Sequence, residues 1–461
     1  MRNDETKFSD GKISRLLEWL NGSGKCYVNP KIEVFEDPLV GRGIRLGNGM
    51  LTKNEVLISI PSSHQLNFHT VLHWIAKFNK NIFTNDNISI GEAATELFDD
   101  QGQEDPRIKA YGIFNQEELT DFNSFQLLCL FILAEWILLP NWSNGTITSW
   151  WKPFFDIFPT DDELRSIPTK WSLVRSDKNA SILLESLPTA SSEHEKRISQ
   201  LLLADWNAVR GFLKKWTEEF THSTIGMDEL FSHFVHIYFV INSRCLYMEI
   251  PLKTDVKDYF TMVPFVDYLN HTNKASLHCY PEINKLKRNV YGLGEFSIRV
   301  GNHQYEKAGE ELFLNYGAHS NDFLLAEYGF TTLCNEWNFI DLTPEFCNMF
   351  TDPKDITFLD NLGYWKDFTI SKGEISYRIL VAVSLLVHRD HRKTERFALG
   401  YITEEYFEPE TSSVINSLLR ELEFQYMSKI DRISEIQDDD WCKRNLLNLY
   451  EGYIEILRSL L

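Results

Sequence analysis

Two stretches in the second half of the chain pair strand-like apolar runs with polar groups at their ends. Residues 264–271 lead from apolar side chains into an amide and an imidazole, Asn270 and His271. Residues 309–317 alternate apolar side chains and end on Tyr316 before a glycine. These patterns predict two strand ends. Because polar groups beside a buried strand are costly unless each finds a partner, we expect a functional cleft where the stretches meet. A hydrogen-bonded polar core is the alternative.

The size and composition of the chain indicate a folded protein with more than one domain. Its 461 residues exceed the length at which a single hydrophobic core stops growing. Hydrophobic residues make up 43% of the chain and aromatic residues 13%, which is enough for packed cores and excludes an intrinsically disordered protein.

The net charge indicates what kind of partner the protein binds, and the cysteines indicate in which cellular compartment it works. A formal net charge of -20 disfavours direct binding to nucleic acid, because affinity for phosphate comes from Lys and Arg. It favours a basic protein partner, with solubility alone as the alternative. The seven dispersed cysteines form no Cys-x-x-Cys pair, which predicts reduced thiols in an intracellular compartment and argues against structural zinc. The first residues are polar and acidic, so we expect no secretory signal.

The most apolar run, residues 125–139, is the one place to consider a membrane span. It contains Gln126 and Glu135, stops at Pro140 and is shorter than the ~20 residues that a span needs. We therefore predict a buried core helix and no membrane association.

The N-terminal part predicts two strands around residues 32–35 and 56–60. Between them, residues 40–49 are dense in glycine. A dinucleotide fingerprint would require a helix after the glycines, whereas a second strand follows here. The spacing therefore predicts a turn between strands.

The rest of the chain alternates in character. Residues 62–225 are helical and irregular, and a helix that begins at Asp228 runs into Arg244. The chain is then strand-rich to Phe330. After Thr331, helix-period apolar residues with many charges suggest a separate helical domain.

Two local patterns have simple explanations. Glu229, His233 and His236 have a spacing that could bind metal on a helix, but an amphipathic surface explains them equally well and no further ligand lies nearby in the sequence. His-Arg-Asp at residues 388–390 lacks every other kinase motif and is predicted to be a charged helix end.

The pair of stretches, 264–271 and 309–317, resembles the paired signature of SET-domain protein lysine methyltransferases, whose two segments cross in a knot-like arrangement. Asn-Ser-Arg at 242–244 resembles a third signature that precedes the pair.

Three further matches are similar to the Rubisco large-subunit methyltransferase-like branch of that family. They are the glycines at 41–43 with the strand after them, Trp-Lys-Pro at 151–153, and residues 321–330. The matches follow the family's order from residue 40 to residue 330.

The resemblance implies an α+β fold with a split SET β-fold, a knot-like C-terminal segment, a helical insertion and a separate all-α C-terminal domain. The implied divisions are residues 1–61 for the first part of the SET domain, 62–225 for the insertion, 226–333 for the catalytic second part, and 334–461 for a helical domain similar to the family's substrate-binding domain. No zinc or other metal is implied.

The resemblance also implies roles for individual residues. Asn270 and His271 would contact S-adenosylmethionine, Arg244 would hold its carboxylate end, and Asp267 would support that site. Tyr316 would be the catalytic tyrosine and would also border the bound cofactor. The backbone from Leu39 to Gly43, with Gly41, Arg42 and Gly43 in it, would line the cofactor, and Tyr280, Tyr328 and Phe330 would wall the lysine channel.

The implied activity is S-adenosylmethionine-dependent methylation of a lysine in a non-histone protein. A ribosomal protein or translation factor fits the charge by complementarity. The related histidine methyltransferases place Asn two residues after the signature arginine, where this chain has Leu246, so lysine is favoured. A catalytically inactive binding module is a further alternative. We expect a cytoplasmic monomer, with the nucleus as the second location.

Overall fold

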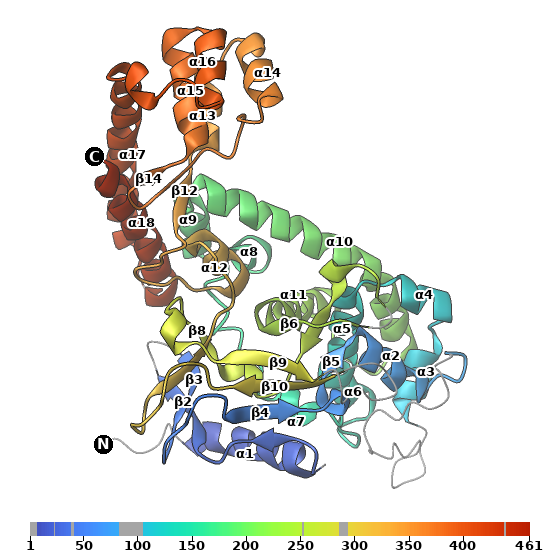
Figure 1. Ribbon diagram of the computed structural model, residues 1–461. Helices are drawn as coiled ribbons and strands as arrows, with labels where there is room; N and C mark the ends of the chain where they lie inside the picture. The colour runs from blue at the N-terminus through green and yellow to red at the C-terminus, as the bar shows by residue number, and fades with distance from the viewer. Residues whose placement is uncertain are drawn as a thin grey trace. The chain divides into compact units, whose positions relative to one another are not determined.

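The computed structural model describes residues 7–22, 24–37, 41–82, 105–250, 253–284, 294–437 and 439–461. Leu39, expected beside the cofactor, lies outside these residues. The chain divides into two compact units (Figure 1). Unit 1 comprises Met1–Leu164 and Ile198–Gly317, and unit 2 comprises Arg165–Arg197 and Ala318–Leu461.

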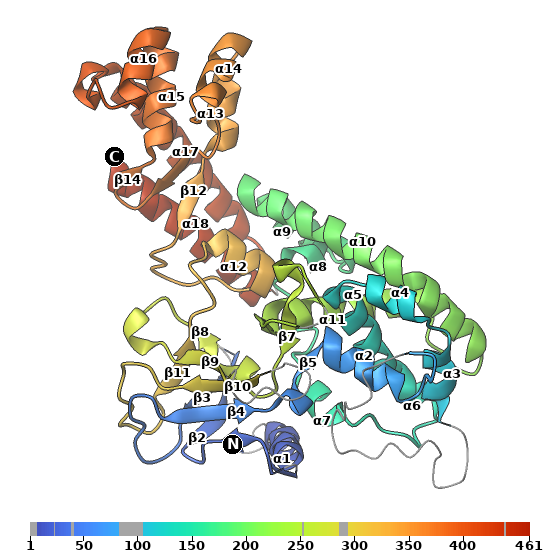
Figure 2. The ribbon, with the colours of Figure 1, turned by 45° about the vertical axis from the view of Figure 1, so that its right-hand side comes forward.

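The described part of unit 1 contains two four-stranded sheets, which lie close together in Figures 1 and 2. The first is antiparallel, in the order β1 (Tyr27–Val28), β4 (Val56–Ile60), β10 (Glu295–Arg299) and β9 (Tyr280–Asn284). The second has the order β2 (Ile32–Asp37), β3 (Gly41–Leu46), β11 (Glu311–Leu314) and β8 (Asn270–His271). A smaller sheet joins β5 (Leu66–Asn67), β7 (Phe260–Met262) and β6 (Cys245–Tyr247).

The glycine-rich segment differs from its prediction. We expected a turn over residues 40–49, but Gly41–Leu46 forms strand β3, paired with β2 on one side and β11 on the other. Ile44 and Leu46 are fully buried, so alternation of apolar residues within the glycine-rich run sets the strand. The prediction failed because glycine weakens the strand signal while long-range pairing overrides it.

Most helices of unit 1 are grouped to one side of the two sheets, with α1 beneath them, and they build a core of their own (Figures 1 and 2). The apolar run predicted to be a core helix extends from Ser124 to Trp142 and has a π-helical middle. Among the described residues it is long and apolar enough to cross a membrane, but 72% of it is buried inside the protein, as expected for a core helix. The helical elements are α1 (Lys7–Gly22), η1 (Ser62–His64), α2 (Phe68–Ala76), α3 (Pro106–Gly112), α4 (Gln116–Asp121), α5 (Ser124–Ile132), η2 (Leu133–Leu138), α6 (Leu139–Trp142), α7 (Lys152–Phe155), α11 (Met227–Arg244), η3 (Val256–Asp258), η4 (Val266–Tyr268) and η5 (Ala275–Leu277).

Glu135 is the polar centre of this helical core. It is 1% exposed and accepts hydrogen bonds from Tyr111 Oη at 2.6 Å and Ser149 Oγ at 2.6 Å. Trp74 Nε1 donates to it at 3.2 Å, and the Arg107 guanidinium lies 3.4 Å away. Its burial is tolerated because each of its two carboxylate oxygens has two donors within 3.4 Å.

Unit 2 is mainly helical, and its α17 and α18 lie side by side (Figures 1 and 2). The expectation of an all-α C-terminal domain needs correction, because β12 (Phe339–Asp341), β13 (Thr369–Ser371) and β14 (Glu374–Ile375) form a small antiparallel sheet. Residues 321–328, placed in a strand-rich stretch by the sequence, form a helix instead. The helices are α8 (Pro168–Leu173), α9 (Lys178–Ser186), α12 (Asn321–Tyr328), α13 (Thr343–Met349), α14 (Pro353–Asn361), α15 (Tyr377–His388), α16 (His391–Ala398), η7 (Glu404–Tyr406), α17 (Glu410–Ser434) and α18 (Asp440–Leu460), and α10 (Thr189–Glu219) runs through both units.

The His-Arg-Asp segment is a helix end, as predicted. Arg389 ends α15 and Asp390 caps α16. Arg389 and His391 both bind the buried carboxylate of Asp355, at 2.9 and 2.7 Å. The segment therefore ties α14 to the turn between α15 and α16.

Candidate active site

The two polar stretches meet in the second sheet of unit 1. Strand β8 runs parallel to β11, with Asn270 opposite Phe313 and His271 opposite Leu314. The pairing continues beyond β8, where Thr272 N donates to Leu314 O at 3.0 Å. Strand β11 is also paired with β3, so the second stretch lies between β3 and the first stretch.

Tyr316 is anchored to the first stretch by two hydrogen bonds. Its backbone N–H donates to His271 Nδ1 at 3.1 Å, and its hydroxyl donates to Leu269 O at 2.7 Å. Because a backbone N–H can only donate, His271 Nδ1 must be an acceptor, so the imidazole is the neutral tautomer with its proton on Nε2. Burial raises the pKa of Tyr316 to about 12, which keeps the phenol neutral at physiological pH.

The Asn270 side chain is held by two acceptors. Its Nδ2 donates to the carbonyl of Arg42 at 2.9 Å and to Glu311 Oε1 at 2.8 Å. Both protons of the amide are therefore used, and its oxygen is turned away from these two groups.

Arg244 ends α11 beside Asp267. Arg244 Nη1 donates to the main-chain carbonyl of Asp267 at 2.6 Å and lies 3.7 Å from the carboxylate. Burial raises the pKa of Asp267, although the Arg244 and Arg42 cations oppose that shift. Arg244 Nε and Asp267 Oδ1 are both buried and have no hydrogen-bond partner among the described residues. A buried donor and a buried acceptor on two neighbouring residues, each without a partner, are suited to a ligand that carries both charges.

The turn before Asp267 is strained. Phe265, a bulky residue that is 1% exposed, has φ 73° and ψ −30°. Such a conformation in a non-glycine residue costs about 1–3 kcal/mol and is concentrated at functional sites. It precedes η4, whose Asp267 carbonyl binds Arg244.

The glycine-rich strand contributes mainly backbone. The guanidinium of Arg42 is engaged elsewhere, since it donates to Ile157 O at 2.8 Å and forms an ion pair with Glu163 at 2.9 Å. Its carbonyl binds Asn270, as described above. Gly41 has φ 79°, which favours glycine at the start of the strand.

The three residues expected to wall a channel lie in different surroundings. Tyr280 is 37% exposed at the start of β9, and its hydroxyl donates to Asn54 Oδ1 at 2.9 Å. Tyr328 and Phe330 belong to unit 2, where their ring centroids are 6.0 Å apart.

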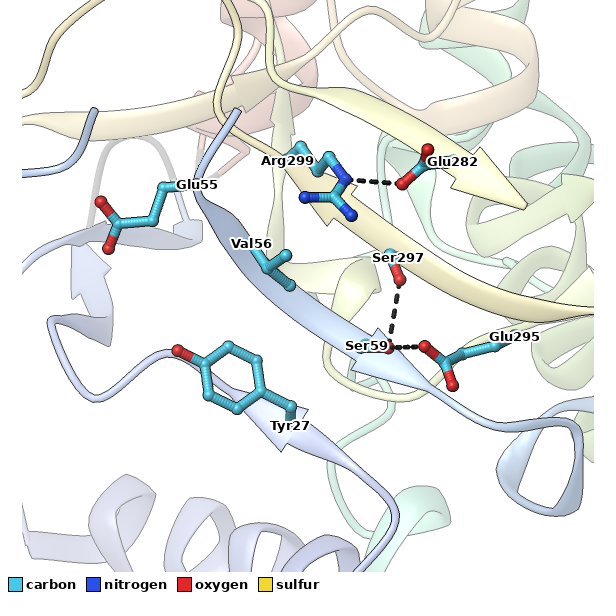
Figure 3. Close-up of a pocket in the computed structure, with 8 residues that line it drawn as sticks. All are labelled: Tyr27, Glu55, Val56, Ser59, Glu282, Glu295, Ser297 and Arg299. Atoms are coloured by element: carbon cyan, nitrogen blue, oxygen red, sulfur yellow. Dashed lines mark hydrogen bonds and ion pairs between the residues drawn. The ribbon is translucent and has the colours of Figure 1, made fainter. Parts of the chain in front are cut away.

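A polar hollow of about 450 Å³ lies on the first sheet and contains none of the predicted site residues (Figure 3). Its charged groups are paired with one another or with neighbours: Arg299 binds Glu282, and Ser297 donates to Ser59, which donates to Glu295. We therefore place the candidate site at β8 and β11. The hollow is lined by Tyr27, Glu55, Val56, Ser59, Glu282, Glu295, Ser297 and Arg299.

Glu229, His233 and His236, whose spacing could have bound metal, do not converge on one point; each histidine lies near a carboxylate. His233 lies 3.8 Å from Glu229, and His236 lies 3.5 Å from Asp161. In the described ranges, no group of three or more His, Cys, Asp or Glu side chains is arranged to hold a metal ion.

Sequence comparison connects the chain with ribosomal lysine methyltransferases. Residues 338–461 match the family model of the ribosomal lysine N-methyltransferase 2 C-terminal domain. The chain is 44% identical to ribosomal lysine N-methyltransferase 2 of Saccharomyces cerevisiae over 97% of its own length and 98% of that protein. It is 24% identical to SET domain-containing protein 4 of Mus musculus, with 72% of each chain covered.

Structural comparison finds the SET domain of LSMT bound to lysine and AdoHcy, with a TM-score of 0.58, 14% sequence identity, and 98% of this chain and 90% of that chain covered. Rubisco LSMT bound to sinefungin and monomethyllysine has a TM-score of 0.55 at 14% identity, with 97% and 90% covered. At this level of identity the matches bear on the fold alone.

Proposed function

The chain belongs to the ribosomal lysine N-methyltransferase family of SET-domain proteins, and from that premise we propose that it methylates a lysine side chain of a ribosomal protein, with S-adenosylmethionine as the methyl donor. Its fold is the α+β SET fold of Rubisco LSMT, with a helical C-terminal region. The observation that carries the proposal is the convergence of Tyr316 with the first stretch, through hydrogen bonds to His271 Nδ1 at 3.1 Å and to Leu269 O at 2.7 Å, where Asn270 and His271 form the strand paired with β11.

The open polar atoms fit the proposed cofactor. The methionine end of S-adenosylmethionine carries a carboxylate and an ammonium group, and the buried Arg244 Nε and Asp267 Oδ1 provide one donor and one acceptor without partners in the described structure. Arg244 would hold the carboxylate, and Asp267 with the Asn270 amide oxygen would accept from the ammonium. The backbone of Gly41, Arg42 and Gly43 would line the same site. When bound, the cofactor supplies an electrophilic methyl group on a sulfonium.

Tyr316 acts as a neutral hydroxyl. With a pKa of about 12 it is almost never a phenolate at pH 7, so it does not serve as the base for the lysine. Neutralising a free lysine at pH 7 costs about 4.6 kcal/mol, and a desolvated site beside a cation lowers that cost by depressing the lysine pKa. The role left for Tyr316, with its proton held by Leu269 O, is to fix the geometry of attack.

The remaining assignments belong to the same proposal. Residues 1–61 and 226–333 form the split catalytic domain with a knot-like crossing at 311–316, residues 62–225 form the insertion, and residues 334–461 bind the protein substrate. Tyr280, Tyr328 and Phe330 contribute to lysine binding. The substrate is basic, as complementarity to a net charge of -20 favours. The protein acts as a cytoplasmic monomer, with the nucleus as the second location.

Transfer of a tritiated methyl group tests the proposal. The purified protein is added with labelled cofactor to ribosomal proteins from cells that lack it, and the labelled band is analysed by mass spectrometry. We expect a methylated lysine in a basic ribosomal protein. A labelled histidine would instead support the alternative that the protein is a histidine methyltransferase. If the protein neither labels a substrate nor binds the cofactor, the result would support an inactive binding module.

A further inference from the structure

Glu311 lies beside the candidate site, although no sequence pattern assigned it a role. Strand β11 pairs with β3 so that Glu311 is opposite Arg45 and its side chain extends diagonally toward Gly43. On the other side, Glu311 Oε1 lies 2.8 Å from Asn270 Nδ2. The carboxylate is therefore held between the glycine strand and the amide.

Two acceptors determine which way the Asn270 amide faces. An asparagine side chain can present either its oxygen or its nitrogen to a neighbour, and the choice follows from the partners. Here the neighbours are the Arg42 carbonyl at 2.9 Å and the Glu311 carboxylate at 2.8 Å, and neither can donate when Glu311 is ionised. The nitrogen must face both, and the oxygen must point to the opposite side, where it can accept from a ligand.

Gly43 makes the approach of Glu311 feasible. A Cβ atom built at Gly43 would lie 2.8 Å from Glu311 Oε1 and 2.7 Å from the ring of Phe35. Contacts this short do not occur between real Cβ atoms and their neighbours, so either the ring or the carboxylate would have to move. The missing side chain at position 43 therefore leaves room for the Glu311 carboxylate and the Phe35 ring.

We propose that Glu311 is a positioning residue, which orients the Asn270 amide so that its oxygen accepts a hydrogen bond from the methyl donor. This inference rests on the proposed function, because it requires S-adenosylmethionine as the ligand. Glu311 itself contacts Asn270, and it acts on the cofactor only through that residue.

The test is a double-mutant cycle on cofactor affinity, measured by calorimetric titration of S-adenosylmethionine. We expect Glu311→Ala to weaken binding about tenfold, which is within the range for losing a hydrogen bond to a charged group. Glu311→Gln, whose side-chain oxygen can accept from Asn270, should bind within about threefold of the wild type. In a protein that already carries Asn270→Ala, Glu311→Ala should raise the Kd for S-adenosylmethionine by less than about twofold, because Glu311 acts on the cofactor only through Asn270.

Glu310→Gln is the matched control, since the Glu310 carboxylate caps the local turn through Glu306 N and Lys307 N, both at 2.8 Å. It should leave affinity unchanged. Glu311→Asp, which keeps the charge but is too short to reach Asn270, repeats the test if the alanine variant does not fold, and it should also weaken binding.

Three results would overturn the inference: wild-type affinity in Glu311→Asp and Glu311→Ala, an equal loss in Glu310→Gln, or an undiminished effect of Glu311→Ala when Asn270 is already alanine. A wild-type protein that binds no S-adenosylmethionine would instead refute the proposed function, and with it this extension. The KM values give a separate readout, because only that for S-adenosylmethionine should rise.

Discussion

Replacing Tyr316 by phenylalanine separates catalysis from cofactor binding. The change removes the hydroxyl that donates to Leu269 O at 2.7 Å. It keeps the backbone N–H that donates to His271 Nδ1 at 3.1 Å, so the link between the two stretches survives. The side chains proposed to hold the cofactor, Arg244 and Asn270, are untouched.

The size of the effect follows from what the hydroxyl does. Leu269 is 1% exposed, so its carbonyl loses a buried partner, and we expect a stability loss of about 1–3 kcal/mol. Removing one preorganised polar group at a reacting centre typically lowers kcat by about 10²–10³-fold, and we expect the lower end of that range. The Kd for S-adenosylmethionine should change by less than about threefold.

Tyr305→Phe is the matched control. Tyr305 is also a buried tyrosine of unit 1, 1% exposed, and its hydroxyl donates to a main-chain carbonyl, Leu277 O, at 3.2 Å. Single-turnover methyl transfer to ribosomal proteins, calorimetric cofactor titration and thermal melting are measured on both variants. The reasoning is refuted if Tyr316→Phe keeps more than about a third of the wild-type rate, or if Tyr305→Phe is slowed as much, since simple loss of a buried hydrogen bond would then explain the effect.

Three further predictions test other parts of the structure. Gly43→Ala should weaken cofactor binding about tenfold in calorimetry, because its Cβ would lie 2.8 Å from Glu311 Oε1 and displace that carboxylate from Asn270. Glu135→Ala should lower the free energy of unfolding by about 3–5 kcal/mol in urea titrations, since it removes the acceptor of three buried donors, Tyr111 Oη, Ser149 Oγ and Trp74 Nε1, whereas Arg107 keeps its ion pair with Asp105. Burial lowers the pKa of His64 to about 4, from 6.5 in the unfolded chain, so the neutral ring contributes stability that is complete above pH 6.5 and is lost as the pH falls toward 4. When the pH falls from 7 to 4.5, the wild type should therefore lose about 2.5 kcal/mol more of its free energy of unfolding than the His64→Phe variant, as measured by urea titration at both pH values.

Much of the fold is readable from local patterns. The strands at residues 32–37 and 56–60, the helix that ends at Arg244 and the long C-terminal helices all follow from apolar periodicity and appear as β2, β4, α11, α15, α17 and α18. The three-residue strands β12 and β13 carry too few residues to show a period. Strand β3 was missed because its glycines favour a turn locally, while its pairing with β11 joins segments that lie more than 260 residues apart in the sequence.

The candidate site was predictable only in part, and for a similar reason. Apolar runs that end in Asn270, His271 and Tyr316 identify the polar groups without showing what holds them. Glu311 has no local signal, because in its own strand it resembles an ordinary outward-facing carboxylate. Its contact with Asn270 exists only once β8 and β11 pair in parallel, and that pairing is a property of the whole sheet.

Three polar side chains of the site share one mode of attachment, since each donates to a main-chain carbonyl of another segment. Tyr316 donates to Leu269 O, Asn270 to Arg42 O and Arg244 to Asp267 O, at 2.7, 2.9 and 2.6 Å. Such anchors depend on backbone position and not on the identity of the accepting residue's side chain. Leu269 can therefore vary among apolar residues that preserve the packing, whereas a shift of the η4 backbone would misplace Tyr316 and Arg244 together, and a shift of β3 would misplace Asn270. Phe265, with its strained φ, lies directly before η4, so a substitution in this turn is the change that we expect to shift the η4 backbone most easily.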